Sequence, residues 1–266
     1  MTRILQISDL HIMPEGDLLP GGVDTAAALR AMLAGLRDLL PSLGPVERLV
    51  ISGDLTETGC AGAYEHLRAL MAEAPLPWRA IPGNHDDREE MRAFAREADW
   101  MPEEGPIDWR EDLEGATILG LDTLVEGSGG GAVSDVTLDW LGDTLRDLSP
   151  RPVLIFMHHP PCATGIAAMD AIGLAPDPRL AALLRDHDGP VQIAAGHVHR
   201  MITGRFAGRQ VTIAPGTAHA VGLDLRPLAG IGVVPGHAGA VLHDVGSEAR
   251  TLLISPQDFA DPVRFG

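Results

Sequence analysis

Residues 3–11, Arg3-Ile4-Leu5-Gln6-Ile7-Ser8-Asp9-Leu10-His11, decide how this chain folds, because an apolar run ends there in two potential metal ligands. A short apolar run of this kind is typical of a buried strand. An apolar run followed by potential ligands recurs four more times. Gly53-Asp54 follows residues 49–52, and Gly83-Asn84-His85-Asp86 follows 80–82. His158-His159-Pro160 follows 153–157, and Gly196-His197-Val198-His199 follows 191–195. Strand ends of an α/β sheet gather at one edge, so we expect these distant side chains to converge.

Composition limits the classes of protein that the chain can represent. With 266 residues and 45% hydrophobic content, it can build one sizeable core. The net charge of −17 repels phosphate polymers, so we expect no nucleic-acid polymer as a partner. Two cysteines exclude a disulfide framework. We find no signal-peptide pattern and no apolar stretch of roughly 20 residues, and we therefore expect a cytoplasmic protein without a membrane partner.

Helical and strand patterns alternate through residues 1–200. We expect helices at 25–40, 61–73, 87–98, 137–148 and 178–187, and a further strand at 117–121. Asp24 is a suitable N-cap for the first helix, and Pro41 is expected to stop it. Such alternation predicts an α/β layered fold.

The C-terminal part has a different character. Residues 201–214 and 240–255 each predict a β-hairpin. Between them, 217–239 is rich in glycine and proline and is expected to be a long loop, of a length that is often functional. It carries an unusual amount of apolar surface for a loop, at Val221, Leu223, Leu225, Leu228, Ile231, Val233 and Val234. We therefore expect a single domain, 1–266, in which 217–266 is a loop-plus-hairpin appendage that caps the site or contacts a second copy in a homo-oligomer. The pocket walls are expected from 217–239 and from 12–23.

The strand ends supply seven potential ligands: Asp9, His11, Asp54, Asn84, His158, His197 and His199. Imidazole nitrogens with carboxylate and amide oxygens suit Fe, Mn or Zn, and the residues do not choose between these metals. Seven donors are too many for one tetrahedral metal site, but they suit two divalent metal ions that share Asp54 as a ligand. Two such ions, two carboxylates and one hydroxide leave a local charge of about +1, which accommodates a small anionic substrate within an acidic protein.

In its motifs the chain resembles the calcineurin-like metallophosphoesterase superfamily, whose pattern is D-x-H, G-D, G-N-H-[DE], H and G-H-x-H. The resemblance spans residues 3 to about 219 and implies two mixed β-sheets packed as a sandwich flanked by helices. It implies one ion on Asp9, His11, Asp54 and His199, and another on Asp54, Asn84, His158 and His197. His85 would stabilise charge or assist the leaving group beside the phosphoryl group, with Asp86 orienting it. His159 would make hydrogen bonds near the site without being a ligand.

A finer resemblance is to the class III cyclic-nucleotide phosphodiesterases and the related glycerophosphodiesterases. It rests on 156–161, on Met169-Asp170, on 135–141 and on 215–219, and it makes His219 a candidate substrate contact beside Asn84 and His85. The resemblance implies in-line hydrolysis of small phosphodiesters by a metal-bridging hydroxide, with His85 assisting departure of the leaving group. Two alternatives remain open: a phosphomonoesterase or phosphonate-ester hydrolase on the same site, and a non-catalytic scaffold.

Overall fold

A computed structural model describes residues 2–227 and 230–260 of the chain, and two large mixed sheets dominate it. The first sheet has the order β13-β12-β1-β2-β3. Its strands β1 (Thr2–Ile7), β2 (Arg48–Ser52) and β3 (Trp78–Ile81) are parallel, whereas β12 (Ala240–Val245) and β13 (Arg250–Ile254) run antiparallel to their neighbours. Because β1, β2 and β3 are parallel neighbours, their carboxyl ends meet at one edge.

The second sheet has the order β4-β5-β6-β7-β9-β8. Four strands form its parallel centre, namely β5 (Thr117–Leu121), β6 (Val153–Met157), β7 (Val191–Ala195) and β9 (Arg209–Ile213), and the antiparallel strands β4 (Trp109–Asp112) and β8 (Ile202–Phe206) close its two edges. Each of the five apolar runs that precede a motif is a strand, three in the first sheet and two in the second.

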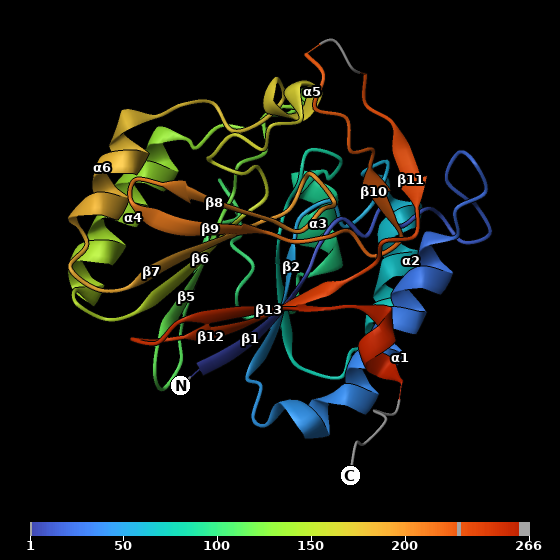
Figure 1. Cartoon of the computed structure of the whole chain (residues 1–266), viewed down its shortest axis with the longest axis horizontal. Helices are drawn as coiled ribbons and strands as arrows, with labels where there is room; N and C mark the ends of the chain where they lie inside the picture. Colours follow the sequence, from blue (N-terminus) through green and yellow to red (C-terminus); the bar gives the residue numbers. More distant parts are fainter. Residues whose placement is uncertain (1, 228–229, 261–266) are drawn as a thin grey trace.

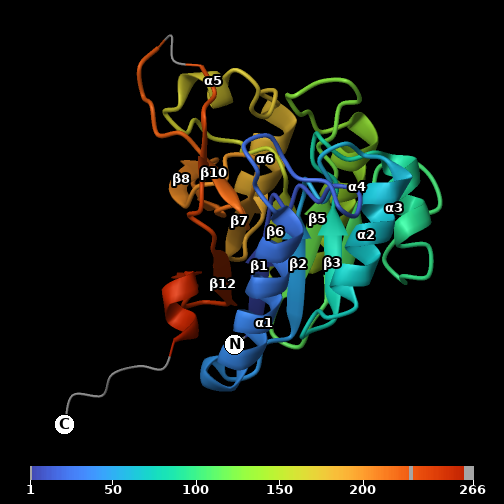
Figure 2. The same ribbon diagram turned by 90° about the vertical axis from the view of Figure 1, so that its right-hand side faces the viewer.

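The sheets pack face to face, with helices on both outer sides (Figures 1 and 2). Helices α1 (Thr25–Leu43), α2 (Ala61–Met71) and α3 (Arg88–Phe94) pack with the first sheet, and α4 (Asp135–Leu148) and α6 (Pro178–Asp186) with the second. The structure also contains two short helices, α5 (Ala167–Asp170) and the 3-10 helix η1 (Pro256–Phe259).

Strand β6 shows why both faces of the second sheet are buried. Side chains alternate along a strand, and Leu154 and Phe156 join the core between the sheets, whereas Val153, Ile155 and Met157 pack toward α4 and α6. A strand covered on both faces is uniformly apolar. The predicted α/β sandwich is therefore confirmed.

Several details differ from the sequence-based expectations. The helix expected at 87–98 ends at Phe94, and the one expected from 137 begins at Asp135. Helix α1 continues past Pro41 to Leu43, because a proline in the final turn removes only one helical hydrogen bond, and the helix ends at Gly44 with φ 73°. The 217–239 segment is not wholly a loop, since β10 (His219–Val221) pairs with β11 (Val233–Pro235). The hairpin 240–255 is not an appendage, because β12 pairs with β1 inside the first sheet.

No helix in 2–227 and 230–260 combines the length and the apolar character that crossing a membrane requires.

A buried polar network joins the two sheets beneath the strand ends. Gln6 of β1 is fully buried and donates from Nε2 to Ser52 Oγ at 2.8 Å and to the carbonyl of Ala195 on β7 at 2.9 Å. Its Oε1 accepts from His243 Nε2 of β12 at 2.9 Å. One side chain thus satisfies polar groups on three strands of both sheets.

We expect Gln6→Leu to lower the free energy of unfolding by about 1–3 kcal/mol, because it leaves these buried partners unsatisfied while conserving volume. Gln210→Leu, the same exchange at an exposed position of β9, is the matched control and should stay within about 0.5 kcal/mol of the wild type. Urea unfolding followed by circular dichroism measures both. Equal midpoints for the two variants would show that the network contributes nothing to stability.

Candidate metal centre

The seven predicted donor residues converge where the carboxyl ends of the two sheets meet. Those after β1, β2 and β3 come from the first sheet, and those after β6 and β7 come from the second. Backbone bonds join neighbouring loops: Asp9 N donates to Gly53 O at 3.1 Å, His11 N to Asp54 O at 3.0 Å, and Gly196 N to His158 O at 3.0 Å. The predicted convergence of these residues at one edge is therefore confirmed.

The carboxylate of Asp54 lies between two groups of donors. Its Oδ2 is 3.5 Å from His11 Nε2 and 3.3 Å from His158 Nε2. On the first side, His199 Nε2 is 3.1 Å from His11 Nε2 and 3.3 Å from Asp9 Oδ1.

On the other side of Asp54, the amide oxygen of Asn84 organises the donors. Asn84 Oδ1 is 3.2 Å from His158 Nε2 and 2.9 Å from His197 Nδ1. Asp54 is therefore the one residue placed to serve both groups.

The loops that carry these ligands adopt an uncommon backbone conformation. Asp9, His11, Asp54, His197 and His199 have φ of 55°, 47°, 49°, 72° and 51°, in the left-handed region. For residues with a Cβ, such a conformation costs of order 1–3 kcal/mol and persists only where the surroundings enforce it. Strain concentrated at five of seven predicted ligands makes this edge the candidate functional site.

Outer hydrogen bonds fix the orientation of three imidazole rings. His11 Nδ1 is 2.6 Å from Glu57 Oε2, His158 Nδ1 is 2.9 Å from Ser52 O, and His197 Nε2 is 3.0 Å from Ile172 O. Each ring thereby presents its other nitrogen to the centre, which is the usual arrangement of a metal-binding histidine. No sequence pattern predicted that the carbonyls of Ser52 and Ile172 take part.

Two buried polar atoms of the centre have no hydrogen-bond partner among the described residues: Asp9 Oδ2 and His199 Nδ1. Asp9 is fully buried, and a carboxylate oxygen without a partner there is costly. A bound cation removes that cost and also accounts for imidazole nitrogens facing each other at 3.1 Å. The residues therefore fit a divalent metal, as the resemblance in the motifs implies.

The carboxylates and imidazoles of the centre shift one another's pKa values. Burial raises the pKa of the Asp54 carboxyl, but the charge and hydrogen bond of His158, together with the charges of His11 and His85, hold that pKa well below its usual value. Burial lowers the pKa of His158, whereas Asp54 raises it, with a result of about 9. Burial lowers the pKa of His197 to about 4 and that of His199 well below its usual value, so both rings are neutral donors at pH 7.

The structure corrects the role expected for Asp86. Its buried carboxylate accepts from the backbone N–H groups of Leu55, Thr56 and Gly83 at 2.9–3.1 Å and from Tyr64 Oη at 2.9 Å, and not from His85. Asp86 therefore holds the loop that carries Asp54, and its position does not let it orient His85.

Glu57 has the place that was expected of Asp86. The carbonyl oxygen of Glu57 is 2.9 Å from His85 Nδ1, and its carboxylate binds His11. One residue thus contacts both a predicted ligand and the predicted leaving-group histidine. Sequence reasoning missed it, although it lies three positions after Asp54, because a lone glutamate in a loop matches no ligand pattern.

The two further histidines occupy different environments. His159 is buried, with Nδ1 2.8 Å from Thr123 Oγ1 and Nε2 3.2 Å from Gly129 O, so both of its nitrogens have partners outside the donor set, although its ring lies 4.6 Å from that of His197. The ring of His219 lies 4.5 Å from that of His199 and 5.3 Å from that of His11, measured between centroids. His219 therefore stands beside the metal centre.

A pocket of about 190 Å³ opens directly over the donors. Its other walls are Met169 and Ile172, in and after α5, and Val221, Ile231 and Val233, from the β10–β11 hairpin. These hairpin residues lie within 217–239, which was expected to form a wall of the pocket. The other expected wall was wrong, because no residue of 12–23 lines the pocket. The segment 12–23 lies elsewhere because Ile12 bridges to Thr56 and Leu19 to Val23. Leu228, also expected in the apolar segment, lies outside the described residues.

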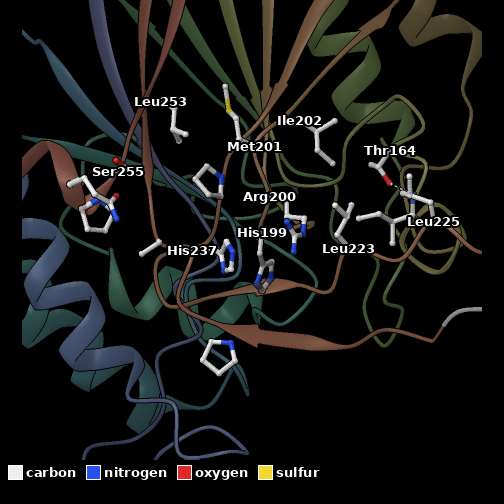
Figure 3. A pocket seen from close by; sticks show the side chains of 16 residues that line it. Thr164, His199, Arg200, Met201, Ile202, Leu223, Leu225, His237, Leu253 and Ser255 are labelled. Carbon is white, nitrogen blue, oxygen red and sulfur yellow. Dashed lines mark hydrogen bonds between the residues drawn. The ribbon is translucent and has the colours of Figure 1, made fainter.

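A larger cavity of about 780 Å³ adjoins this pocket and shares His199 with it (Figure 3). Leu223 and Leu225 of the hairpin, Thr164 and Arg200 are among its lining residues. The guanidinium of Arg200 donates from Nε to the carbonyl of Val221 and so ties the end of β10 to the second sheet.

Sandwich architecture with a histidine- and aspartate-rich centre at the strand ends defines a metallophosphoesterase. The sequence model of the family described as calcineurin-like phosphoesterase matches residues 2–201, and the chain belongs to that family. The predicted family is thereby confirmed.

Similar proteins support the predicted branch. A probable glycerophosphodiester phosphodiesterase GpdQ of Arcobacter nitrofigilis is 33% identical over 224 residues, covering 84% of this chain and 81% of that protein. A probable cyclic nucleotide phosphodiesterase of Rhodopseudomonas palustris is 33% identical over 264 residues, covering 97% and 92%. A dimetal phosphatase from Danio rerio shares the fold, with a TM-score of 0.62, 17% identity and coverage of 96% and 98%.

Gly83 tests how tightly Asp54 is held. A Cβ at this position would collide with Asp54 Oδ1 and with its backbone nitrogen. We expect Gly83→Ala to displace that carboxylate and to weaken metal affinity by about 10–100-fold, as loss of supporting contacts does elsewhere. Metal content after dialysis, measured by elemental analysis, checks this.

Gly62→Ala is the matched control, since its Cβ would meet only Pro14 Cβ at 3.8 Å on an exposed face of α2. Circular dichroism shows whether each variant folds. A folded Gly83→Ala protein that retains metal like the control would mean that Asp54 need not stay in place.

Proposed function

We propose that the chain hydrolyses small phosphodiesters, of cyclic nucleotide or glycerophosphodiester type, with two divalent cations at this centre. The observation that carries the proposal is the position of Asp54 Oδ2 between His11 and His158, each with its own set of further donors. The names of the relatives from Arcobacter nitrofigilis and Rhodopseudomonas palustris support the same chemistry.

In this proposal, two donor groups hold the ions. One ion is held by Asp9, His11, Asp54 and His199, and the other by Asp54, Asn84, His158 and His197. Two adjacent divalent cations, when bound, supply an acidified water for in-line attack and positive charge for the phosphoryl oxygens. Fe, Mn and Zn all suit these ligands.

His85 is the proposed proton donor to the leaving group. It lines the pocket, and the 2.9 Å contact of its Nδ1 with Glu57 O fixes its ring so that Nε2 remains available for the departing alkoxide. An imidazole suits proton transfer near neutral pH. Asn84 and His219 line the same pocket and are proposed to contact the substrate.

Charge favours a diester over the monoester alternative. Among the described residues that line the pocket there is no arginine or lysine, whereas Glu57 adds a negative charge beside Asp54. A monoester dianion needs more positive charge than the ions leave after pairing with these carboxylates, and a bidentate arginine is the usual source. A diester monoanion does not need it.

Metal-dependent turnover of a substrate panel tests the function. We expect activity on bis(p-nitrophenyl) phosphate to vanish after chelation and to return with Mn²⁺, Zn²⁺ or Fe²⁺. The value of kcat/KM for this diester should exceed that for p-nitrophenyl phosphate by at least about tenfold, equivalent to about 1.4 kcal/mol of transition-state discrimination. A monoester preference would favour the phosphomonoesterase alternative, and metal-loaded protein without any turnover would favour a scaffold.

Two substitutions separate proton transfer from metal binding. His85→Ala should lower kcat by about 10²–10⁴-fold with little change in metal content, because it removes a proton donor and no ligand. Asp54→Ala should lose both ions, measured by elemental analysis. His66→Ala, on α2 and outside the pocket lining, is the control for histidine loss. Two tightly held metals in Asp54→Ala would refute the bridging role.

A further inference from the structure

The pocket over the donors has two chemically different halves. One half consists of polar residues, and the other consists only of Met169, Ile172, Val221, Ile231 and Val233. The polar half comprises five of the predicted ligands and three further residues: His11, Asp54, Asn84, His197, His199, Glu57, His85 and His219. Among these described lining residues, no side chain of the second half carries an oxygen or a nitrogen, and its one weak acceptor is the thioether sulfur of Met169. We infer that this half, hereafter the apolar wall, narrows the proposed function: it selects phosphodiesters whose ester substituent is apolar, and of the two proposed substrate types it disfavours glycerophosphodiesters, whose substituent is a polyol. The inference rests on the proposed phosphodiesterase function.

Strand register places the hairpin part of the wall. In the β10–β11 ladder, Val221 pairs with Val233, and His219 pairs with Pro235. Positions two apart along a strand share a face, so Val221 and Val233 lie on the same face as His219, which stands beside the metal centre. Val221 is 4% exposed, whereas Val233 is 58% and Ile231 is 52% exposed. The wall thus begins within the centre and continues outward as uncovered apolar surface.

The segment around α5 supplies the rest of the wall. Ile172 is tied to the centre, because its carbonyl lies 3.0 Å from His197 Nε2. Met169 is 4% exposed and packs in the core of the second sheet. In Figure 1, α5 and the β10–β11 hairpin lie at the same end of the molecule. Both contributions are therefore anchored to the ligands, and they are not free loops.

The size of the pocket defines which part of a substrate the wall touches. A volume of about 190 Å³ is below the roughly 300–1,000 Å³ of sites that enclose a whole drug-sized ligand. It holds the phosphoryl group and the first atoms of a substituent. An oxygen among those atoms loses water without gaining a partner, whereas a methylene there gains burial.

The matched substrates are butyl and 2-methoxyethyl p-nitrophenyl phosphate. They have the same charge, leaving group and chain length. They differ at one position, which is a methylene group in the butyl ester and an ether oxygen in the 2-methoxyethyl ester. With the metal-loaded protein we expect kcat/KM to be about five- to tenfold higher for the butyl ester, after division by the ratio of the uncatalysed hydrolysis rates. Because the result is a ratio on one preparation, it does not depend on how much of the protein carries metal.

Variants of the wall give a second measurement. The double exchange Val221→Thr and Val233→Thr keeps the side-chain shape and adds hydroxyl groups, so it should reduce the butyl preference to about twofold or less. Val136→Thr, at a 65% exposed position of α4, should keep the preference of the wild type. Equal rates on both esters in the wild type, or a preference that persists in the double variant, would overturn the inference.

Failure of the proposed function has a different outcome. In that case neither ester is hydrolysed by metal-loaded protein, and calorimetry of the same two esters then measures the wall directly. Tighter binding of the butyl ester would support the wall without the chemistry, and equal binding would refute it. If Val233→Asp instead converts a dimer to a monomer in light scattering and leaves the ester preference unchanged, this face belongs to a contact with a second copy and the inference is wrong.

Discussion

The position of one carboxylate governs the rest of this structure. Asp54 lies at the junction of the two sheets, within 3.5 Å of a histidine from each sheet. It stays there because its loop is held from several sides: Asp54 Oδ1 accepts from His85 N at 2.9 Å, and the buried Asp86 carboxylate binds the backbone of Leu55 and Thr56. Most other contacts of the centre support this placement.

Several features of the centre raise the free energy of the folded state, and the remainder of the fold must offset this. Several ligands adopt left-handed backbone conformations, and the carboxylates of Asp9 and Asp54 are buried side by side. Burial and the neighbouring Asp54 both raise the pKa of Asp9, although His158 partly offsets this. A divalent cation neutralises this repulsion, so metal binding and stability of this edge are coupled. The double-sided core beneath, with strands such as β6 buried on both faces, supplies the rigidity that holds the strained loops.

Sequence patterns correctly predicted that the seven potential donors converge, because each follows a strand, and strand ends in parallel sheets have only one edge at which to meet. They failed where a contact depends on the path of the chain between elements. Asp86 follows His85 directly, yet its carboxylate turns toward Leu55 and Thr56, and the carbonyl of Glu57 takes its expected partner. Pro41 was expected to end helix α1, but the helix ends at Gly44. The hairpin 240–255 was recognised as two strands, but a local pattern does not reveal that β12 pairs with β1 almost 240 residues away.

By itself, the sequence determined the sandwich class, the donor residues and their chemical preference for divalent cations, since periodicity and residue type are local properties. Only the tertiary structure decided which donors face each other across Asp54, which carbonyls orient the imidazole rings, and that Met169 and Val233 close the same pocket. These relations are distances between segments far apart in the chain. Such distances follow from how two sheets and their connections pack, and no short stretch of sequence encodes them.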